Sequence, residues 1–135
     1  KRCRSKFIYG DAVITDNKND YLLKAKKFSY INMFIWGTRT VCHQSIFVNK
    51  VSCIKYDEKL ELKAELQWYF NILDKCKDHF KIQEPICKYL VGGITEKKFL
   101  KEIKETFIVM LKINIIYSFL HLPILIYKIL KKIFR

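Results

Sequence analysis

The chain has 135 residues, half of them apolar and 15% aromatic, a composition that supports one domain with a modest core and excludes a disordered chain. Lysine and arginine outnumber aspartate and glutamate by 26 to 13, and the formal charge of +13 favours polyanionic partners: nucleic acid, an anionic membrane surface or phosphorylated substrates. Five cysteines without a C-x-x-C pair, and three histidines outside metal-ligand spacing, predict reduced thiols in a cytoplasmic setting rather than a zinc site or a disulfide framework.

The first part of the chain predicts extended segments joined by a polar turn. Residues 7–14 are aromatic and β-branched around one glycine and predict a strand, and residues 21–23 predict the start of a returning strand after the turn at 16–20. Residues 28–41 mix aromatic and polar side chains and predict a loop or a short helix. Residues 41–48 return to an apolar run that predicts a short buried strand.

Residues 60–76 form the clearest predicted helix, because apolar side chains recur there at spacings of three and four. Residues 80–84 then alternate like a strand until Pro85, which predicts a bend or an edge position because proline cannot donate to a sheet ladder. Residues 86–91 predict a second extended piece, which a pair of glycines ends. Strands and helices therefore alternate, and the fold class is predicted to be α/β.

The last third predicts helices. Thr95 can cap a helix whose first turn carries an acidic residue, as the helix dipole favours. The composition changes near residue 107, and residues 113–127 carry no formal charge. We therefore divide the chain into an α/β part, residues 1–106, and a basic amphipathic helical tail, residues 107–135.

The tail suits a membrane surface better than a membrane span. Its uncharged window is shorter than the roughly 20 apolar residues that cross a bilayer, and Pro123 should kink or end a helix. Apolar bulk flanked by lysines favours contact with anionic headgroups, as in interfacial helices. Packing against protein and a true membrane span remain the two alternatives.

Glu65 is the first candidate site residue, because it is an acid on or beside the apolar stripe of the predicted helix 60–76. A carboxylate on a rigid helix that faces a cleft can act as a general base. The alternative interpretation is a solvated glutamate that pairs with a nearby lysine, which is the commoner role of helix carboxylates.

Two further polar or flexible pairs are candidates for substrate binding. His43 and Gln44 interrupt an apolar run and can hydrogen-bond a diphosphate or a sugar hydroxyl, although a buried strand histidine satisfied by backbone groups is equally compatible with the pattern. Gly92 and Gly93 allow a close backbone approach to a ligand, or simply a strand-to-helix turn.

Residues 7–106 contain five short motifs whose types and order resemble those of family 2 glycosyltransferases. Each motif is weak by itself, and the resemblance depends on their order. The motifs are Tyr9-Gly10-Asp11, His43-Gln44-Ser45-Ile46-Phe47, Tyr56-Asp57, Ala64-Glu65 with Trp68, and Gly92-Gly93-Ile94-Thr95.

This resemblance implies the acceptor-side part of a GT-A type catalytic domain followed by C-terminal helices. It implies an inverting enzyme of polysaccharide biosynthesis that transfers a sugar from a nucleotide-sugar donor to a glycan or lipid-linked acceptor at the cytoplasmic face of the cell membrane. The acid after Ala64 is the family's general base, so that role falls to Glu65, where aspartate is commoner. Substrate-binding roles fall to His43, Gln44, Trp68, Gly92 and Gly93.

The resemblance also defines what the chain lacks. The family's nucleotide-binding half carries an Asp-x-Asp pair that holds a divalent metal, Mg or Mn, and no such pair precedes Tyr9. We therefore expect a missing N-terminal half in a longer protein, a partner chain, or a remnant without activity. We also expect sheet strands that cannot all find partners within this chain. The alternative function is a non-enzymatic basic module that binds a membrane or nucleic acid, although no motif for specific nucleic-acid binding is present.

Overall fold

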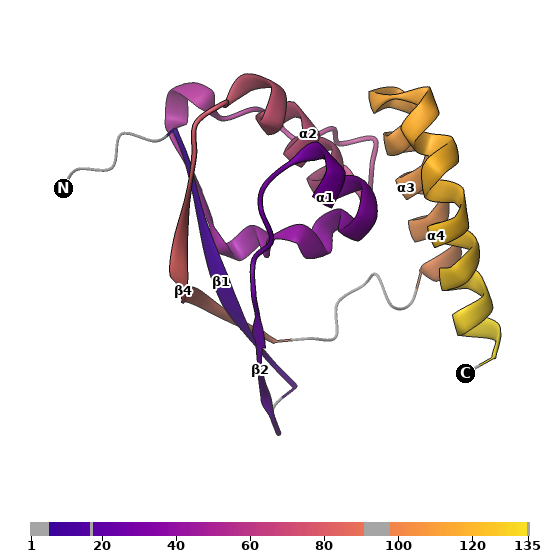
Figure 1. The fold of residues 1–135 in the computed structure, drawn as a ribbon, viewed down its shortest axis with the longest axis horizontal. Helices are drawn as coiled ribbons and strands as arrows, with labels where there is room; N and C mark the ends of the chain where they lie inside the picture. Colours follow the sequence, from indigo (N-terminus) through magenta and orange to yellow (C-terminus); the bar gives the residue numbers. More distant parts are fainter. Residues whose placement is uncertain (1–5, 17, 91–97, 135) are drawn as a thin grey trace.

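The computed structural model describes residues 6–16, 18–90 and 98–134 of the chain. Within them the protein is mixed α/β, with a four-stranded sheet and four α-helices, as the alternating sequence pattern predicted. Figure 1 shows the sheet on one side, two helices in the middle and a pair of long helices as an outer layer.

The sheet is organised around β1 (Phe7–Thr15), which every other described strand contacts. β4 (His79–Leu90) pairs with β1 in parallel along its whole length. β2 (Asp20–Leu23) and β3 (Ile46–Val48) are antiparallel to β1 and pair with its two ends, so they share the edge that β4 leaves open. The expectation that some strands would lack partners is therefore wrong for the described strands.

The bend predicted at Pro85 is a bulge within β4, and the two extended pieces predicted around it form this one strand. The register with β1 shifts between Gly10 and Ala12, where Pro85 lies opposite Asp11. Proline is tolerated at a bulge because the ladder is already interrupted there. A Cβ atom on Gly10 would lie 3.0 Å from the Ile86 side chain, so the glycine lets the bulge lie close to β1.

The four α-helices are α1 (Tyr30–Trp36), α2 (Ala64–Lys75), α3 (Phe99–Ile113) and α4 (Ile115–Ile133). The apolar face of α2 belongs to the main core, which it forms together with buried side chains from β1, α1 and α3. Burial of this stripe, rather than helix propensity, is the main source of stability for a helix of this length.

Two predicted elements differ from the structure near α1 and α2. The stretch 28–41, predicted as a loop or a short helix, contains the short helix α1, followed by the 3-10 turn η1 (Gly37–Thr40). Only residues 46–48 of the strand predicted at 41–48 are extended in the sheet, because the 3-10 turn η2 (His43–Ser45) precedes them. A further short turn, η3 (Lys50–Ser52), follows β3. α2 begins at Ala64 instead of residue 60, for a reason that the site explains.

The two C-terminal helices form the outer layer. α3 runs through residue 107 without a break, and its Val109 and Met110 are fully buried in the main core, so the expected domain boundary falls inside a helix. α4 continues past Pro123, so of the two predicted outcomes, a kink or an end of the helix, the end does not occur. No helix among the described residues is long and apolar enough to span a bilayer.

Candidate functional site

The fold brings together two candidate residues that are far apart in the sequence. Glu65 lies in the first turn of α2, and its Oε1 is 3.5 Å from Nδ1 of His43 on η2. The same oxygen accepts a hydrogen bond of 2.5 Å from the Tyr69 hydroxyl, one helical turn further along. Among the described residues, the second oxygen of Glu65 makes no hydrogen bond or ion pair. One oxygen is thus held in place and the other remains available.

Tyr69 connects this carboxylate to the turn that carries the histidine. Its hydroxyl lies 3.0 Å from the carbonyl oxygen of Val41, two residues before His43, as well as beside Glu65. Tyr69 is fully buried, and burial, followed by the charge of Glu65, raises the pKa of its hydroxyl well above the usual range. The phenol therefore stays protonated and acts as a hydrogen-bond donor at every physiological pH.

His43 is the titratable partner of the site. Contact with the Glu65 carboxylate is the main cause that raises the pKa of the imidazole above 6.5, against the opposing effect of partial burial. The side chain of His43 is 52% exposed and that of Glu65 26% exposed, so both can be reached from solvent. Gln44 is exposed beside His43 on the same turn.

The aromatic side chain available to a ligand is Tyr56 rather than the predicted Trp68. Trp68 is 6% exposed, and its indole nitrogen donates a hydrogen bond of 2.7 Å to the Ile54 carbonyl oxygen. Tyr56 stacks on Trp68 with ring centroids 5.6 Å apart and is half exposed. Trp68 lies three residues after Glu65 on α2, so the ring stacked on it is on the Glu65 side of the helix. Burial, followed by the charge of Glu65, raises the pKa of Tyr56. The sequence placed Tyr56 only in the short motif Tyr56-Asp57, without a substrate-binding role.

The glycine pair predicted to contact substrate, Gly92 and Gly93, lies outside the described residues. Asp11, the acid of the first motif, has a structural role: it is buried, accepts a hydrogen bond from the backbone nitrogen of Ala25 and lies 3.4 Å from Nζ of Lys81. The Tyr-Gly-Asp motif still contacts the site, because the Ser45 hydroxyl on η2 donates to the Gly10 carbonyl oxygen at 2.8 Å.

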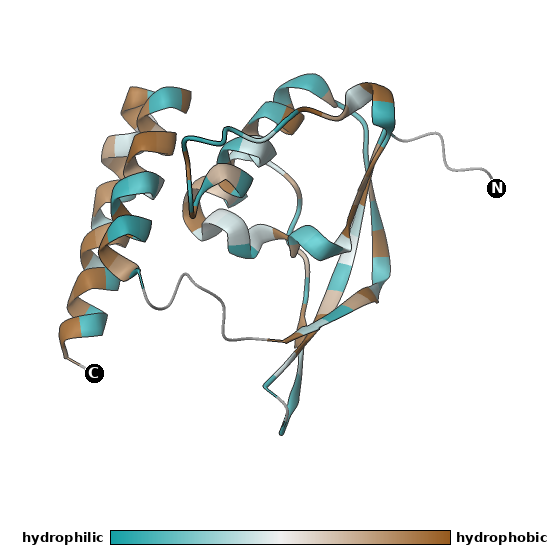
Figure 2. Cartoon of the chain, turned by 180° about the vertical axis from the view of Figure 1, so that it is seen from behind, coloured by the Kyte–Doolittle hydropathy of each residue, from teal (hydrophilic) through white to brown (hydrophobic). Residues whose placement is uncertain are grey.

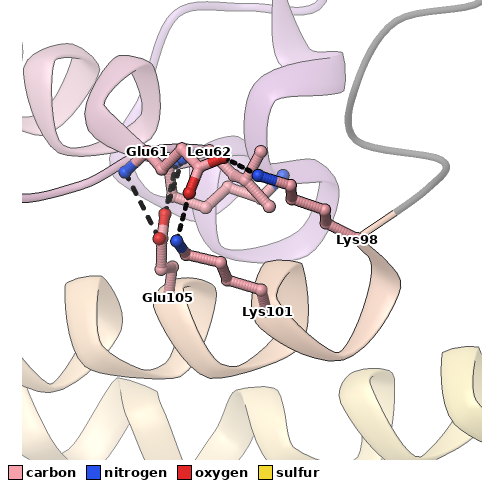
Figure 3. A network of polar contacts seen from close by, with 6 residues as sticks. Glu61, Leu62, Lys98, Lys101 and Glu105 are labelled. Atoms are coloured by element: carbon pink, nitrogen blue, oxygen red, sulfur yellow. Dashed lines mark hydrogen bonds and ion pairs between the residues drawn. The ribbon is translucent and has the colours of Figure 1, made fainter.

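A buried glutamate that sequence reasoning missed fixes the beginning of α2. The Glu105 carboxylate reaches across from α3 and accepts hydrogen bonds from three successive backbone nitrogens, those of Glu61 (3.3 Å), Leu62 (2.7 Å) and Lys63 (3.0 Å) (Figure 3). These contacts fix the three residues that lead into α2, which has no side-chain N-cap of its own, and a negative charge suits the positive end of the helix dipole. Because Glu105 binds these nitrogens, the helix starts at Ala64 rather than at residue 60.

Ion pairs reinforce the same junction between α2 and α3. Lys63 Nζ lies 2.9 Å from Glu102 Oε1, and both side chains are largely buried. Glu61 pairs with Lys98 and Lys101 at the exposed rim (Figure 3). The acids of α3 at spacing three were the only sequence pattern that pointed to this contact. Since Glu65 follows directly in the first turn of α2, α3 determines where the candidate base lies.

The His43–Glu65 pair can be reached directly from solvent. A cavity of about 590 Å³ lies elsewhere on α2, where Gln67, Asn71 and Asp74 line it together with Tyr30. Successive residues of a helix are turned by about 100°, so Gln67 points away from the Glu65 side of α2. In the part of the chain that the structure describes, no group of three or more acidic, histidine or cysteine side chains could hold a metal ion.

The His43–Glu65 arrangement holds the Glu65 carboxylate in one orientation, and its second oxygen can accept a proton. The His43 imidazole and the half-exposed Tyr56 phenol are available to hydrogen-bond a polar ligand. Comparisons with protein-family models, with curated proteins and with solved structures found no match to this chain.

Proposed function

We propose that the chain provides the acceptor-side part of a GT-A type catalytic domain of a family 2 glycosyltransferase, with Glu65 as general base. The observation that supports this proposal is the convergence of three motifs that were selected separately along the sequence. His43 contacts Glu65 at 3.5 Å, and Ser45 of the same turn donates to Gly10 of the Tyr-Gly-Asp motif at 2.8 Å. Residues from motifs that are far apart in the sequence thus lie in contact, which a substrate-binding site built from several segments requires.

In this mechanism the second oxygen of Glu65 takes the proton of an acceptor hydroxyl while that hydroxyl attacks the anomeric carbon of the donor sugar. The bond to the nucleoside diphosphate breaks on the opposite side, so the configuration at the anomeric carbon inverts. Tyr69 and His43 hold the first oxygen and so reduce the loss of carboxylate freedom on substrate binding. The raised pKa of His43 increases its imidazolium fraction near neutral pH, which suits a diphosphate neighbour.

The nucleotide and its divalent metal are assigned to a second part of the catalytic domain, contributed by another segment or a partner chain. The metal would neutralise charge on the donor diphosphate, and the described residues do not supply its ligands. β4 offers a place for that second part, since β1 is its only partner within the described sheet and its other edge is open.

The test of this function is the substitution Glu65→Gln, which keeps the shape of the side chain but removes the proton acceptor. We expect turnover to fall by about 10²- to 10⁴-fold, the usual contribution of a general base. Release of nucleoside diphosphate should be measured with a panel of nucleotide sugars and with glycan and lipid-linked acceptors. The protein used should include whatever its gene encodes ahead of Lys1.

Glu58→Gln is the matched control, because Glu58 is an exposed glutamate a short distance before α2. Its turnover should equal that of the wild type. Equal turnover of the Glu65 variant and the wild type would remove Glu65 from the mechanism, and no release from any donor would refute the transferase proposal itself.

For the location of the protein, we propose peripheral attachment to the anionic inner face of the cell membrane through α4. Ser118 and His121 are buried on the inner side of this helix together with Leu125, whereas most of its large apolar side chains are exposed. Ile116, Phe119 and Tyr127 are each at least 60% exposed, and Figure 2 shows the hydrophobic colour along this helix. Exposed lysines follow at its C-terminal end, a distribution typical of interfacial helices.

Co-sedimentation with anionic vesicles tests this attachment. Binding should weaken with added salt, because headgroup attraction is screened over about 8 Å at physiological ionic strength, and a salt-resistant remainder should be lost when Ile115, Phe119 and Ile126 are made polar. The same substitutions should leave turnover on a soluble acceptor unchanged. Absence of pelleting would exclude the membrane, and pelleting that does not change with salt would exclude the electrostatic part of the attachment. Pelleting without any Glu65-dependent turnover would favour the non-enzymatic alternative.

A further inference from the structure

Two cysteines from different segments face each other next to the candidate site. Cys42 directly precedes His43, Cys87 lies in β4, and their sulfur atoms are 4.0 Å apart. A disulfide bond is about 2.05 Å long, so the two sulfurs would have to approach by roughly 2 Å. Cys42 is buried and Cys87 is partly exposed. No other pair of cysteines among the described residues is in contact.

The backbone on both sides of this pair is attached to the same strand. Cys87 lies opposite Ala12 of β1, just after the bulge. The turn that follows Cys42 is held to β1 by the Ser45 hydroxyl, which lies 2.8 Å from the carbonyl oxygens of both Gly10 and Cys42. These contacts keep the two thiols in proximity, so little chain entropy remains to be lost when a covalent bond forms between them.

We propose that Cys42 and Cys87 form a reversible disulfide when the protein meets an oxidant of the peroxide class. The peroxide converts the Cys87 thiol to a sulfenic acid and releases one water. The Cys42 sulfur then attacks the Cys87 sulfur, the S–O bond breaks, and the departing hydroxide leaves as a second water with the Cys42 proton. The two thiols supply the two electrons that reduce one peroxide, and a thiol reductant reverses the reaction.

Accessibility sets the order of these two steps. Burial is the main cause that raises the pKa of the Cys42 thiol to about 11, so Cys42 reacts poorly with an oxidant in solution. Cys87 can be reached from solvent and is oxidised first, which leaves Cys42 to resolve the sulfenic acid from the protein side. The product links β4 covalently to the turn that carries His43, and so it fixes one side of the His43–Glu65 site.

Oxidation of the full chain with hydrogen peroxide tests this inference. The number of free thiols should fall by two, and dithiothreitol should restore both. Tryptic digestion without reduction should yield the peptide of residues 40–50 joined to that of residues 82–88. The oxidised chain should also melt several degrees higher than the reduced chain.

Cys87→Ser should abolish the linked peptide, and because Cys87 is partly exposed this variant is expected to fold. Cys53→Ser is the control, since Cys53 is exposed and its sulfur contacts the Ile54 carbonyl oxygen, and it should leave the link intact. Conversion of Cys87 to sulfinic or sulfonic acid with Cys42 unmodified, or cross-linking of chains through Cys53 alone, would overturn the proposal. These readouts do not depend on any transferase activity.

Discussion

Two glutamates lie at the beginning of α2, one on the helix itself and one reaching it from α3, and their surroundings differ. Glu105 is buried, and its carboxylate binds three backbone nitrogens. Glu65 is partly exposed, and its carboxylate is held through one oxygen by a phenol and an imidazole. A carboxylate saturated by backbone donors stabilises the fold, whereas one with an available oxygen can exchange a proton with a ligand.

Glu105→Ala has the largest expected effect and tests the difference between the two glutamates most directly. This change leaves three backbone nitrogens without their acceptor at a helix end, and we expect the free energy of unfolding to fall by roughly 3 to 4 kcal/mol. Urea denaturation followed by circular dichroism measures the effect. Glu65→Ala should lose about 1 kcal/mol or less, since its contacts are fewer and nearer to solvent. Similar losses for the two variants would contradict the distinction between these carboxylates.

The ion pair between Lys63 and Glu102, beside Glu105, tests the difference between buried and exposed carboxylates with a smaller expected effect. Glu102→Gln leaves the buried ammonium of Lys63 without its counter-charge, and a loss of about 2 to 3 kcal/mol in the free energy of unfolding is expected. Replacing both residues by apolar ones, Lys63→Met with Glu102→Leu, should recover much of that loss. Glu61→Gln at the exposed rim is the matched control and should leave the melting temperature nearly unchanged. A double variant as unstable as Glu102→Gln would rule out desolvated charge as the cause.

Tyr69→Phe tests what the phenol contributes on the Glu65 side of the helix. It removes one buried hydroxyl that lies between Glu65 and the Val41 carbonyl oxygen, so the free energy of unfolding should fall by about 1 kcal/mol. Tyr30→Phe provides the comparison, because the Tyr30 hydroxyl donates to Asp74 at an exposed position. That control should cost less than Tyr69→Phe in the same denaturation experiment. An equal or larger cost would mean that burial does not strengthen the Tyr69 contact.

The smallest expected effect is the pH dependence that His43 contributes. Because Glu65 raises the pKa of folded His43 above the unfolded value of 6.5, the contact stabilises the fold fully below pH 6.5, and this contribution disappears as the pH rises through the folded pKa. Titration of the imidazole by NMR should show a lower pKa in Glu65→Gln than in the wild type or in Glu58→Gln. The stability cost of Glu65→Gln should be larger at pH 6 than at pH 9. An unchanged imidazole titration would separate His43 from Glu65 in solution.

Local patterns in the sequence were enough to predict β1, the extended nature of β4 and the apolar face of α2. Alternation and three- or four-residue spacing act through neighbouring residues, so they can be recognised in a short window. The same patterns identified Glu65 and His43 as unusual polar residues within apolar stretches. They did not identify Tyr56 as the exposed ring of the site, because exposure depends on what packs against a side chain.

Tertiary structure decided the rest, through contacts between residues distant in the chain. Glu105 of α3 sets the first residue of α2, the hydrogen bond from Ser45 to Gly10 favours a turn over a strand at His43, and the register of β4 brings Cys87 to Cys42. Each contact depends on a buried polar group that must find a partner somewhere in the fold. The sequence alone determined which side chains were available for chemistry, and only long-range packing and hydrogen bonding determined which of them meet.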